Sequence, residues 1–111
     1  KPTTCDLYIA AMGENASLKA TELCNNLRID GFKVQTDICG KGLKPQMKFA
    51  NKIGATFTLV LGDNELEIGK ANLKNMQTGE QREINLADLS DELFKALNEN
   101  AFTDLTNSII D

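Results

Sequence analysis

The pattern of apolar and polar positions divides the chain into eight expected elements. A short apolar run at 5–11 predicts a buried strand. Apolar residues at helical spacing follow over 14–31, where Gly31 is a natural stop, and 32–38 then alternates as a half-buried strand near a sheet edge. One helix between two strands forms a β-α-β unit, which makes the strands parallel. The predicted inner face of the helix comprises Leu18, Ala20, Leu23, Cys24 and Leu27.

A loop at 39–42 leads into a second predicted helix, which ends near residue 54. Pro45 belongs in its first turn, where the missing backbone N–H does little harm. Successive residues turn by about 100° around a helix, so the face each residue takes follows from its number. The face predicted to pack inward contains Leu43, Met47, Ala50 and Gly54, with Phe49 and Ile53 beside it, and the opposite face contains Lys44, Lys48 and Lys52.

The next part of the chain predicts three more strands. Residues 55–62 form the most strand-like run in the chain, continuous enough for a central strand, and 63–69 are rich in turn formers and predict a short connector. Residues 70–76 alternate between one apolar and one polar face. A tight turn at Gly79 then brings 81–86 back as a hairpin partner.

An amphipathic helix at 86–100 closes the predicted fold, and the eleven residues from 101 to 111 carry weak signals, so we expect a fraying tail there. The order β-α-β-α-β-β-β-α predicts an α/β domain over 1–100, with three α/β/α layers around a mixed five-stranded sheet. The residues expected to face inward from the last helix are Leu89, Leu93, Phe94 and Leu97.

Composition fits one ordinary globular domain and limits its chemistry. The chain has 111 residues, 41% of them hydrophobic and 25% charged, with no apolar run of the roughly 20 residues that span a bilayer. Its formal net charge of −4 argues against a protein that coats nucleic acid non-specifically. Local charge differs from the sum, because four lysines recur every three or four residues along the second helix: Lys41, Lys44, Lys48 and Lys52.

Cysteine and histidine usage excludes several kinds of active site. The three cysteines, Cys5, Cys24 and Cys39, show no CxxC spacing or recognisable zinc-ligand cluster, and we expect buried free thiols. The chain has no histidine, which excludes a Ser-His or Cys-His nucleophile within it. A small flavodoxin-like enzyme is also disfavoured, because the sequence has neither a glycine-rich phosphate loop nor an acidic triad.

The stretch GKGLKPQMKFANKIGATFTLVLGDNELEIGKANLKNMQTGEQREINL resembles the C-terminal anticodon-binding domain of class II aminoacyl-tRNA synthetases, most closely the histidine-specific members. The order of motifs carries the resemblance: a helix with L-K-x-Q-x-K-x-A-x-K-x-G-A, an apolar strand ending in Gly, then ELEIGKANLKNMQTGEQ. The preceding GENASLKATELCNNLRIDGFKV fits the family's first helix and second strand. Pro45 and the pair Lys41-Gly42 depart from the usual family residues.

The resemblance implies strand order 2-1-3-4-5 with the fourth strand antiparallel. It also implies a cytoplasmic, homodimeric enzyme that uses ATP and Mg²⁺ to activate histidine and attach it to tRNA(His). The catalytic domain of such an enzyme precedes this domain, and none of the class II active-site motifs occurs in these residues. We therefore expect no catalytic residue, metal or cofactor here. The implied partners are the tRNA(His) anticodon loop and the enzyme's own catalytic domain, with no membrane or DNA partner.

Anticodon bases are single-stranded, so proteins read them by their edges and by stacking, and hold the flanking phosphates with lysine or arginine. A glutamate can accept hydrogen bonds from guanine, and an asparagine can pair with a base edge in either direction. The candidate surface is the polar face of the fourth strand with the turn before it, and the resemblance favours Glu67 and Asn72 on it. Its members are Glu65, Glu67, Lys70, Asn72 and Lys74. The predicted phosphate contacts are Lys41, Lys44, Lys48 and Lys52, and the predicted base-reading residues are Gln46, Glu67, Lys70, Asn72 and Lys74.

Two plainer interpretations stay open. The lysines can simply solvate an outer helix face, and residues 70–76 can be an ordinary half-exposed strand. At the level of function, the alternative is a regulatory or protein-contact domain of a synthetase-like paralogue that does not select tRNA.

Overall fold

A mixed five-stranded sheet forms the centre of the molecule, with strand order β2-β1-β3-β4-β5. β1 is parallel to both β2 and β3, whereas β4 is antiparallel to β3 and to β5. The predicted order and the antiparallel fourth strand are confirmed. The elements are β1 (Cys5–Ala11), α1 (Glu14–Ile29), β2 (Val34–Thr36), α2 (Leu43–Lys52), β3 (Ala55–Leu61), α3 (Asp63–Ile68), β4 (Lys70–Asn75), β5 (Gln81–Asn85), a 3-10 turn (Leu86–Asp88) and α4 (Leu89–Ile110).

The computed structural model describes residues 5–36 and 42–110, with side chains described as far as residue 99. Outside these residues lie the last two residues of the predicted second strand and most of the loop after it, which includes Cys39 and Lys41. In the described part of the chain, no helix is long and apolar enough to cross a membrane.

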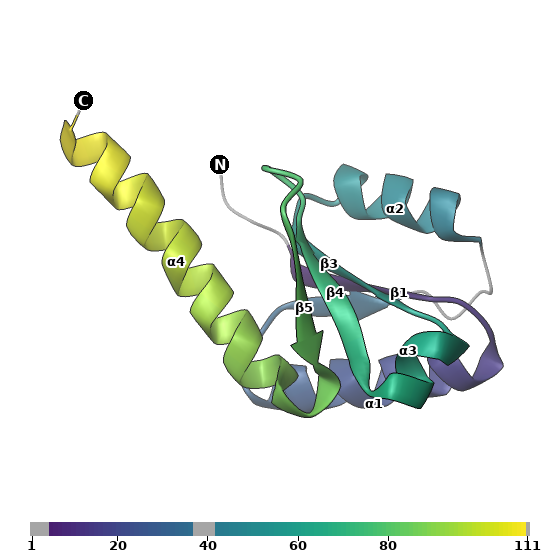
Figure 1. Ribbon diagram of the computed structural model, residues 1–111. Coiled ribbons are helices and arrows are strands. Elements are labelled where there is room, and N and C mark those ends of the chain that lie inside the picture. The colour runs from purple at the N-terminus through teal and green to yellow at the C-terminus, as the bar shows by residue number, and fades with distance from the viewer. Residues whose placement is uncertain (1–4, 37–41, 111) are drawn as a thin grey trace.

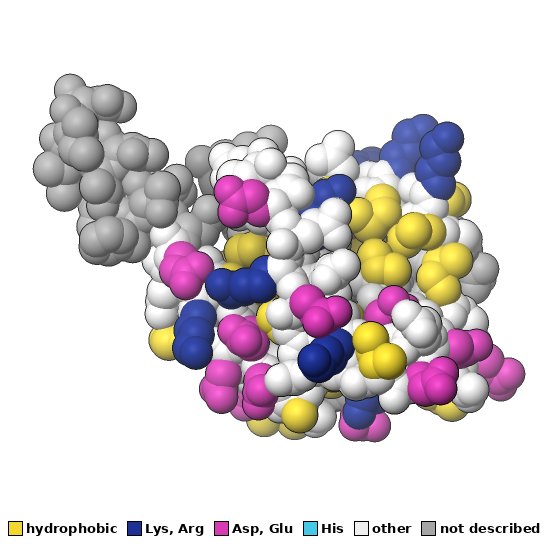
Figure 2. Space-filling view, viewed as in Figure 1, with side chains coloured by type: hydrophobic (Ala, Val, Ile, Leu, Met, Phe, Trp, Pro, Cys, Tyr) yellow, Lys and Arg dark blue, Asp and Glu magenta, His cyan; other side chains and the backbone are white. Residues whose placement is uncertain are grey.

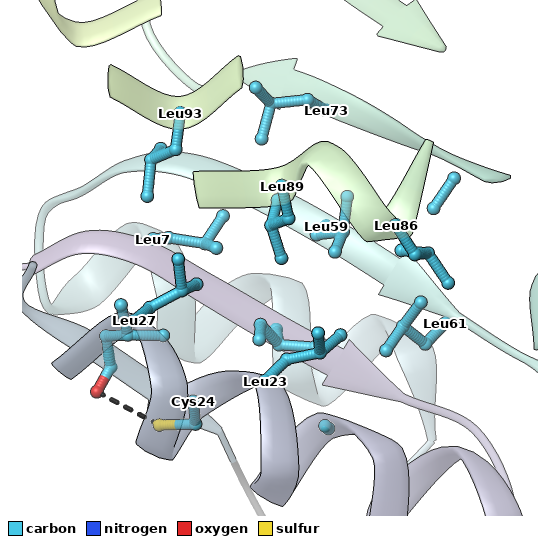
Figure 3. Packing of buried hydrophobic residues seen from close by; sticks show 14 of the residues in the cluster. Leu7, Leu23, Cys24, Leu27, Leu59, Leu61, Leu73, Leu86, Leu89 and Leu93 are labelled. Atoms are coloured by element: carbon cyan, nitrogen blue, oxygen red, sulfur yellow. Dashed lines mark hydrogen bonds between the residues drawn. The ribbon is translucent and has the colours of Figure 1, made fainter. Parts of the chain in front are cut away.

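Helices cover the two faces of the sheet unequally. α1 and the first turns of α4 pack on one face, and α2 lies on the other, which makes the expected three layers (Figure 1). The larger core lies under α1 and α4, where leucines from the helices and from β1, β3 and β4 converge (Figure 3). The smaller core under α2 is built by residues of β1, β3 and α2. The burial of the strands reflects this arrangement. β1 and β3 are buried or half-buried along their whole length, whereas the buried residues of β4 are Ala71 and Leu73 on one face.

Three details of the predicted helices are wrong. Residues 63–69 are not a turn-rich connector, because Asp63–Ile68 form α3, which ends at Gly69 with a left-handed φ of 71°. Leu18 of α1 and Phe94 of α4 are 68% and 60% exposed, so neither faces inward. Ala16 and Ala96 occupy buried positions on these helices instead.

α4 is longer than expected. It continues to Ile110, through the part of the chain predicted to fray. No glycine or proline interrupts the sequence from Leu89 to Ile110, so nothing in the local chemistry stops the helix at residue 100.

Candidate nucleic-acid interface

A groove of about 370 Å³ lies beside α2 on its face of the sheet. α2 contacts β1 and β3, and the groove continues beside it over residues of β4 and β5. One wall of the groove is therefore helix, and the floor is strand. The residues lining it are Leu43, Met47, Thr58, Val60, Glu65, Asn72, Lys74 and Gln81.

The pleat of β4 aims two of the predicted base-reading residues into this groove. Ala71 and Leu73 are buried in the larger core, so the alternate residues of the strand point to the α2 face. Lys74 pairs directly with Thr58 of β3 and Gln81 of β5, and residues paired across strands share a face. Lys70 and Asn72 follow the same alternation, although Lys70 does not line the groove.

The α2 wall is apolar, and it differs from the predicted packing face. Leu43 is 38% exposed and Met47 is half-buried, and both line the groove. The buried face of α2 instead centres on Gln46 and Ala50. Figure 2 shows apolar side chains gathered below α2, with lysine or arginine side chains above them at its outer edge. The groove is thus bordered by hydrocarbon on one side and by polar groups on the other.

Gln46 does not lie in the groove. Its side chain is 0% exposed, so its prediction as a base-reading residue is wrong. Its Nε2 donates a hydrogen bond to the carbonyl of Ala11, at 2.9 Å, and its Oε1 accepts one from the Tyr8 hydroxyl, at 3.5 Å. The helical period puts Gln46 at the edge of the predicted inner face of α2. A polar side chain at such a position is ordinarily expected to be exposed to solvent.

The α2 lysines lie near the groove and outside it. Lys44 and Lys48 directly follow Leu43 and Met47, so about 100° of helix rotation carries them from the groove wall toward its outer rim. Lys52 is exposed as well. These three lysines keep their predicted solvent-facing position, and their contact with phosphate stays a prediction.

α3 brings a carboxylate to the groove, and it is that of Glu65 and not that of Glu67. Glu65 is the third residue of the helix, and its Oε1 accepts a hydrogen bond from the Gly62 N–H, at 2.8 Å. A β-carbon on Gly62 would lie 3.0 Å from that oxygen, so glycine leaves room for the carboxylate. Glu67 is exposed, and it is not among the groove-lining residues. The preference for Glu67 came from the family resemblance, which does not indicate how the helix α3 directs each side chain.

Gln81 and the helix α3 were missed in the sequence. Gln81 lies at the start of β5, and its pairing with Lys74 follows only once the hairpin register is known. Glu65 was among the polar residues of this region, yet only the capping of α3 fixes its direction. The hydrogen bond from Gly62 follows a known signature, a glutamate three residues after a helix cap, which could have indicated the helix.

The described thiols take no part in the groove. Cys5 and Cys24 are free and buried, as expected. Desolvation by burial raises the pKa of both thiols above the ordinary value. Cys24 Sγ donates to the Val34 carbonyl, at 3.4 Å, which joins α1 to β2 inside the larger core (Figure 3).

Comparison with known proteins agrees with this fold and site. A family model described as "Anticodon binding domain" matches residues 6–96, and the chain belongs to that family. A domain of this kind is a nucleic-acid-binding module, which accords with the groove and its lysine-bearing rim.

The relatives narrow the comparison to one kind of enzyme. The chain is 50% identical over 86 residues to histidine–tRNA ligase of Clostridium perfringens, and this match covers 78% of the chain and 21% of the ligase. It is 49% identical over 88 residues to histidine–tRNA ligase of Acetivibrio thermocellus, covering 79% of the chain and 21% of that ligase. The chain therefore spans about a fifth of the length of these relatives.

A solved structure extends the likeness to three dimensions. The apo crystal structure of S. aureus histidyl-tRNA synthetase matches with a TM-score of 0.79 and 43% identity, over 82% of this chain and 27% of that one. The RNA-binding domain of threonyl-tRNA synthetase from Cryptosporidium parvum shares the fold at 19% identity and a TM-score of 0.73.

Proposed function

We propose that this chain is the anticodon-reading domain of a histidine–tRNA ligase and that the groove beside α2 holds the anticodon bases. The observation that carries the proposal is the composition of the groove. A carboxylate, an amide and a lysine, from Glu65, Asn72 and Lys74, line it together with an apolar wall. Such a set suits unstacked bases, which offer polar edges and flat apolar faces.

Each part of the groove has a distinct task. The carboxylate of Glu65 would repel a phosphate, so its role in an RNA-binding groove would be to accept hydrogen bonds. A base edge that presents hydrogen-bond donors would supply them. Guanine presents two such donors side by side on its pairing edge, at N1 and N2. Base pairing with the histidine codons CAU and CAC requires the anticodon GUG, which has guanine at both ends. Asn72 and Gln81 can donate to a base or accept from it.

The phosphate contacts come from the rim. Lys44 and Lys48 on α2 border one side of the groove, so the backbone of a strand lying in it would pass beside positive charges. Leu43 and Met47 would contact the base faces and exclude water from the hydrogen bonds on the floor. The domain would thus hold the loop by its backbone and select it by its bases.

The rest of the enzyme's activity belongs to the proposal. The catalytic domain of the ligase would bind ATP and Mg²⁺, activate histidine and transfer it to tRNA(His), as a cytoplasmic homodimer. The groove described here contributes affinity and selection, and chemistry takes place elsewhere in the enzyme.

Fluorescence anisotropy with a labelled anticodon stem-loop tests the proposal. We expect the chain to bind a GUG loop at least tenfold more tightly than a loop with the same bases in scrambled order, since one mismatched base contact is worth about 1–3 kcal/mol. Equal, salt-sensitive binding of both loops would contradict base reading. Failure to bind either loop would favour a protein-contact domain.

A further inference from the structure

We propose that Gln46 is a positioning residue, which sets the distance between α2 and the floor of the groove. This inference rests on the proposed function for its consequence in RNA binding, and on the contacts of α2 for its structural part. The hydrogen bonds of Gln46 to Ala11 and Tyr8 attach α2 to β1, and the effect on the groove passes through Leu43 and Met47.

The apolar attachment of α2 is thin. In this ten-residue helix, all of which is described, the fully buried side chains are Gln46 and Ala50. Ala50 offers a single methyl group, and Met47 and Ile53 are only partly buried against the smaller core. The ring of Phe49, 41% exposed, meets the ring of Tyr8 edge-on, with 5.8 Å between centroids. No side-chain hydrogen bond caps the helix at Gly42. Apolar burial by itself is non-directional, so we infer that the polar contacts of Gln46 help to fix the position of α2 on the sheet.

The hydrogen bonds of Gln46 supply that direction. Its Nε2 lies 2.9 Å from the carbonyl oxygen of Ala11, the last residue of β1. Ala11 is itself held in register with Leu61 at the middle of the sheet. At the other end of the amide, the Tyr8 hydroxyl lies 3.5 Å from Oε1. Two contacts to one strand, three residues apart, fix both the height and the rotation of the helix.

The groove wall follows from that anchor. Leu43 and Met47 lie one turn before Gln46 and immediately after it, on the side toward β4. Any movement of α2 about Gln46 therefore changes the distance from these two side chains to Asn72 and Lys74. An apolar residue at position 46 would fill the same space and keep the helix attached, but it would not define where the wall stands.

The test compares Gln46→Met with Leu93→Ala. Methionine keeps the approximate length of the side chain and removes the amide, and with it the hydrogen bonds to Ala11 and Tyr8. Leu93 is 0% exposed in the larger core, on the opposite face of the sheet, so its truncation destabilises the chain without touching α2. Both variants are measured at a temperature and urea concentration where unfolding curves show the folded state above about 99%.

Hydrogen exchange gives the first result, without RNA. We compare the ratio of the exchange rates of the α2 amides to those of the α1 amides. In Gln46→Met we expect this ratio to be at least tenfold higher than in the wild type. In Leu93→Ala the protection of both helices should fall together. Unchanged α2 protection relative to α1 in Gln46→Met would overturn the proposal, whatever the chain binds.

Stem-loop binding gives the second result. We expect Gln46→Met to weaken binding of the GUG loop about tenfold and to reduce its preference over the scrambled loop, whereas Leu93→Ala keeps both within about twofold. Equal binding by the two variants would refute the positioning role. If the wild type itself does not distinguish the loops, the proposed function fails, and the exchange measurement alone decides the role of Gln46.

Discussion

Replacing Glu65 by glutamine separates base reading from structural capping. The Oε1 of a glutamine at this position can still accept the hydrogen bond from the Gly62 N–H, which is 2.8 Å long, so α3 keeps its cap. The remaining oxygen, however, becomes an NH₂ group. The groove then presents donors where guanine also presents donors, and the acceptor that the second carboxylate oxygen offered to guanine is lost.

Two effects of opposite sign follow. Loss of a bidentate base contact costs about 1–3 kcal/mol, or roughly 5- to 150-fold in affinity for the guanine-containing loop. Removal of a negative charge favours RNA of any sequence, by a few-fold at most in a solvated groove. We therefore expect the variant to bind the GUG loop more weakly and the scrambled loop as tightly as the wild type or more tightly.

Glu67→Gln is the matched control, because it removes the same charge two residues away on an exposed side chain that does not line the groove. The assay is anisotropy with GUG, scrambled and inosine-substituted loops, inosine being guanine without its N2 amino group. In the wild type, inosine at the contacted position should weaken binding, and Glu65→Gln should be insensitive to it. If Glu65→Gln and Glu67→Gln show the same preference for GUG, Glu65 does not read guanine.

Three further predictions concern charge, packing and the thiols. Lys48→Ala should weaken binding of both loops about equally, and it should lower the slope of log affinity against log salt concentration by roughly 0.7 to 1. Lys95→Ala on α4 is the control and should change neither the affinity nor the slope in the same salt titrations. Leu93→Ala should reduce the free energy of unfolding by about 2–5 kcal/mol, and a loss under 1 kcal/mol in urea would contradict its buried position. Cys5 and Cys24 should react with iodoacetamide far more slowly in the native chain than in urea, because burial excludes the reagent and raises the pKa of each thiol. Peptide mass mapping measures the two rates, and equal rates in the native and unfolded chain would refute the protection of these thiols.

The strands were predictable because their patterns are unambiguous. Residues 55–61 form a continuous run of apolar and threonine residues, which is typical of a central strand, and the alternation at 70–75 matches a strand with one covered face. The short helix α3 was missed because six residues give too few turns for a periodic signal, and only its capping interactions distinguish it from a turn.

The site was predictable as a region and not as a set of atoms. Asn72 and Lys74 face the groove because their strand alternates, which the sequence contains. Gln46 and Glu65 depend on tertiary contacts, with Ala11 in one case and with the Gly62 N–H in the other. A polar side chain on an amphipathic helix is expected to face water. Nothing in the sequence around Gln46 indicates that a backbone carbonyl of β1 accepts its hydrogen bond in the folded chain.

An amide chemical-shift titration with the GUG stem-loop, beside one with the scrambled loop, tests the central claim most directly. The account predicts shifts at Leu43 and Met47 on α2, at Glu65, and at Asn72 and Lys74 on β4, larger for the GUG loop, with α1 unaffected. Shifts that fall on α1 and α4, or that are the same for both loops, would contradict an anticodon-reading groove beside α2.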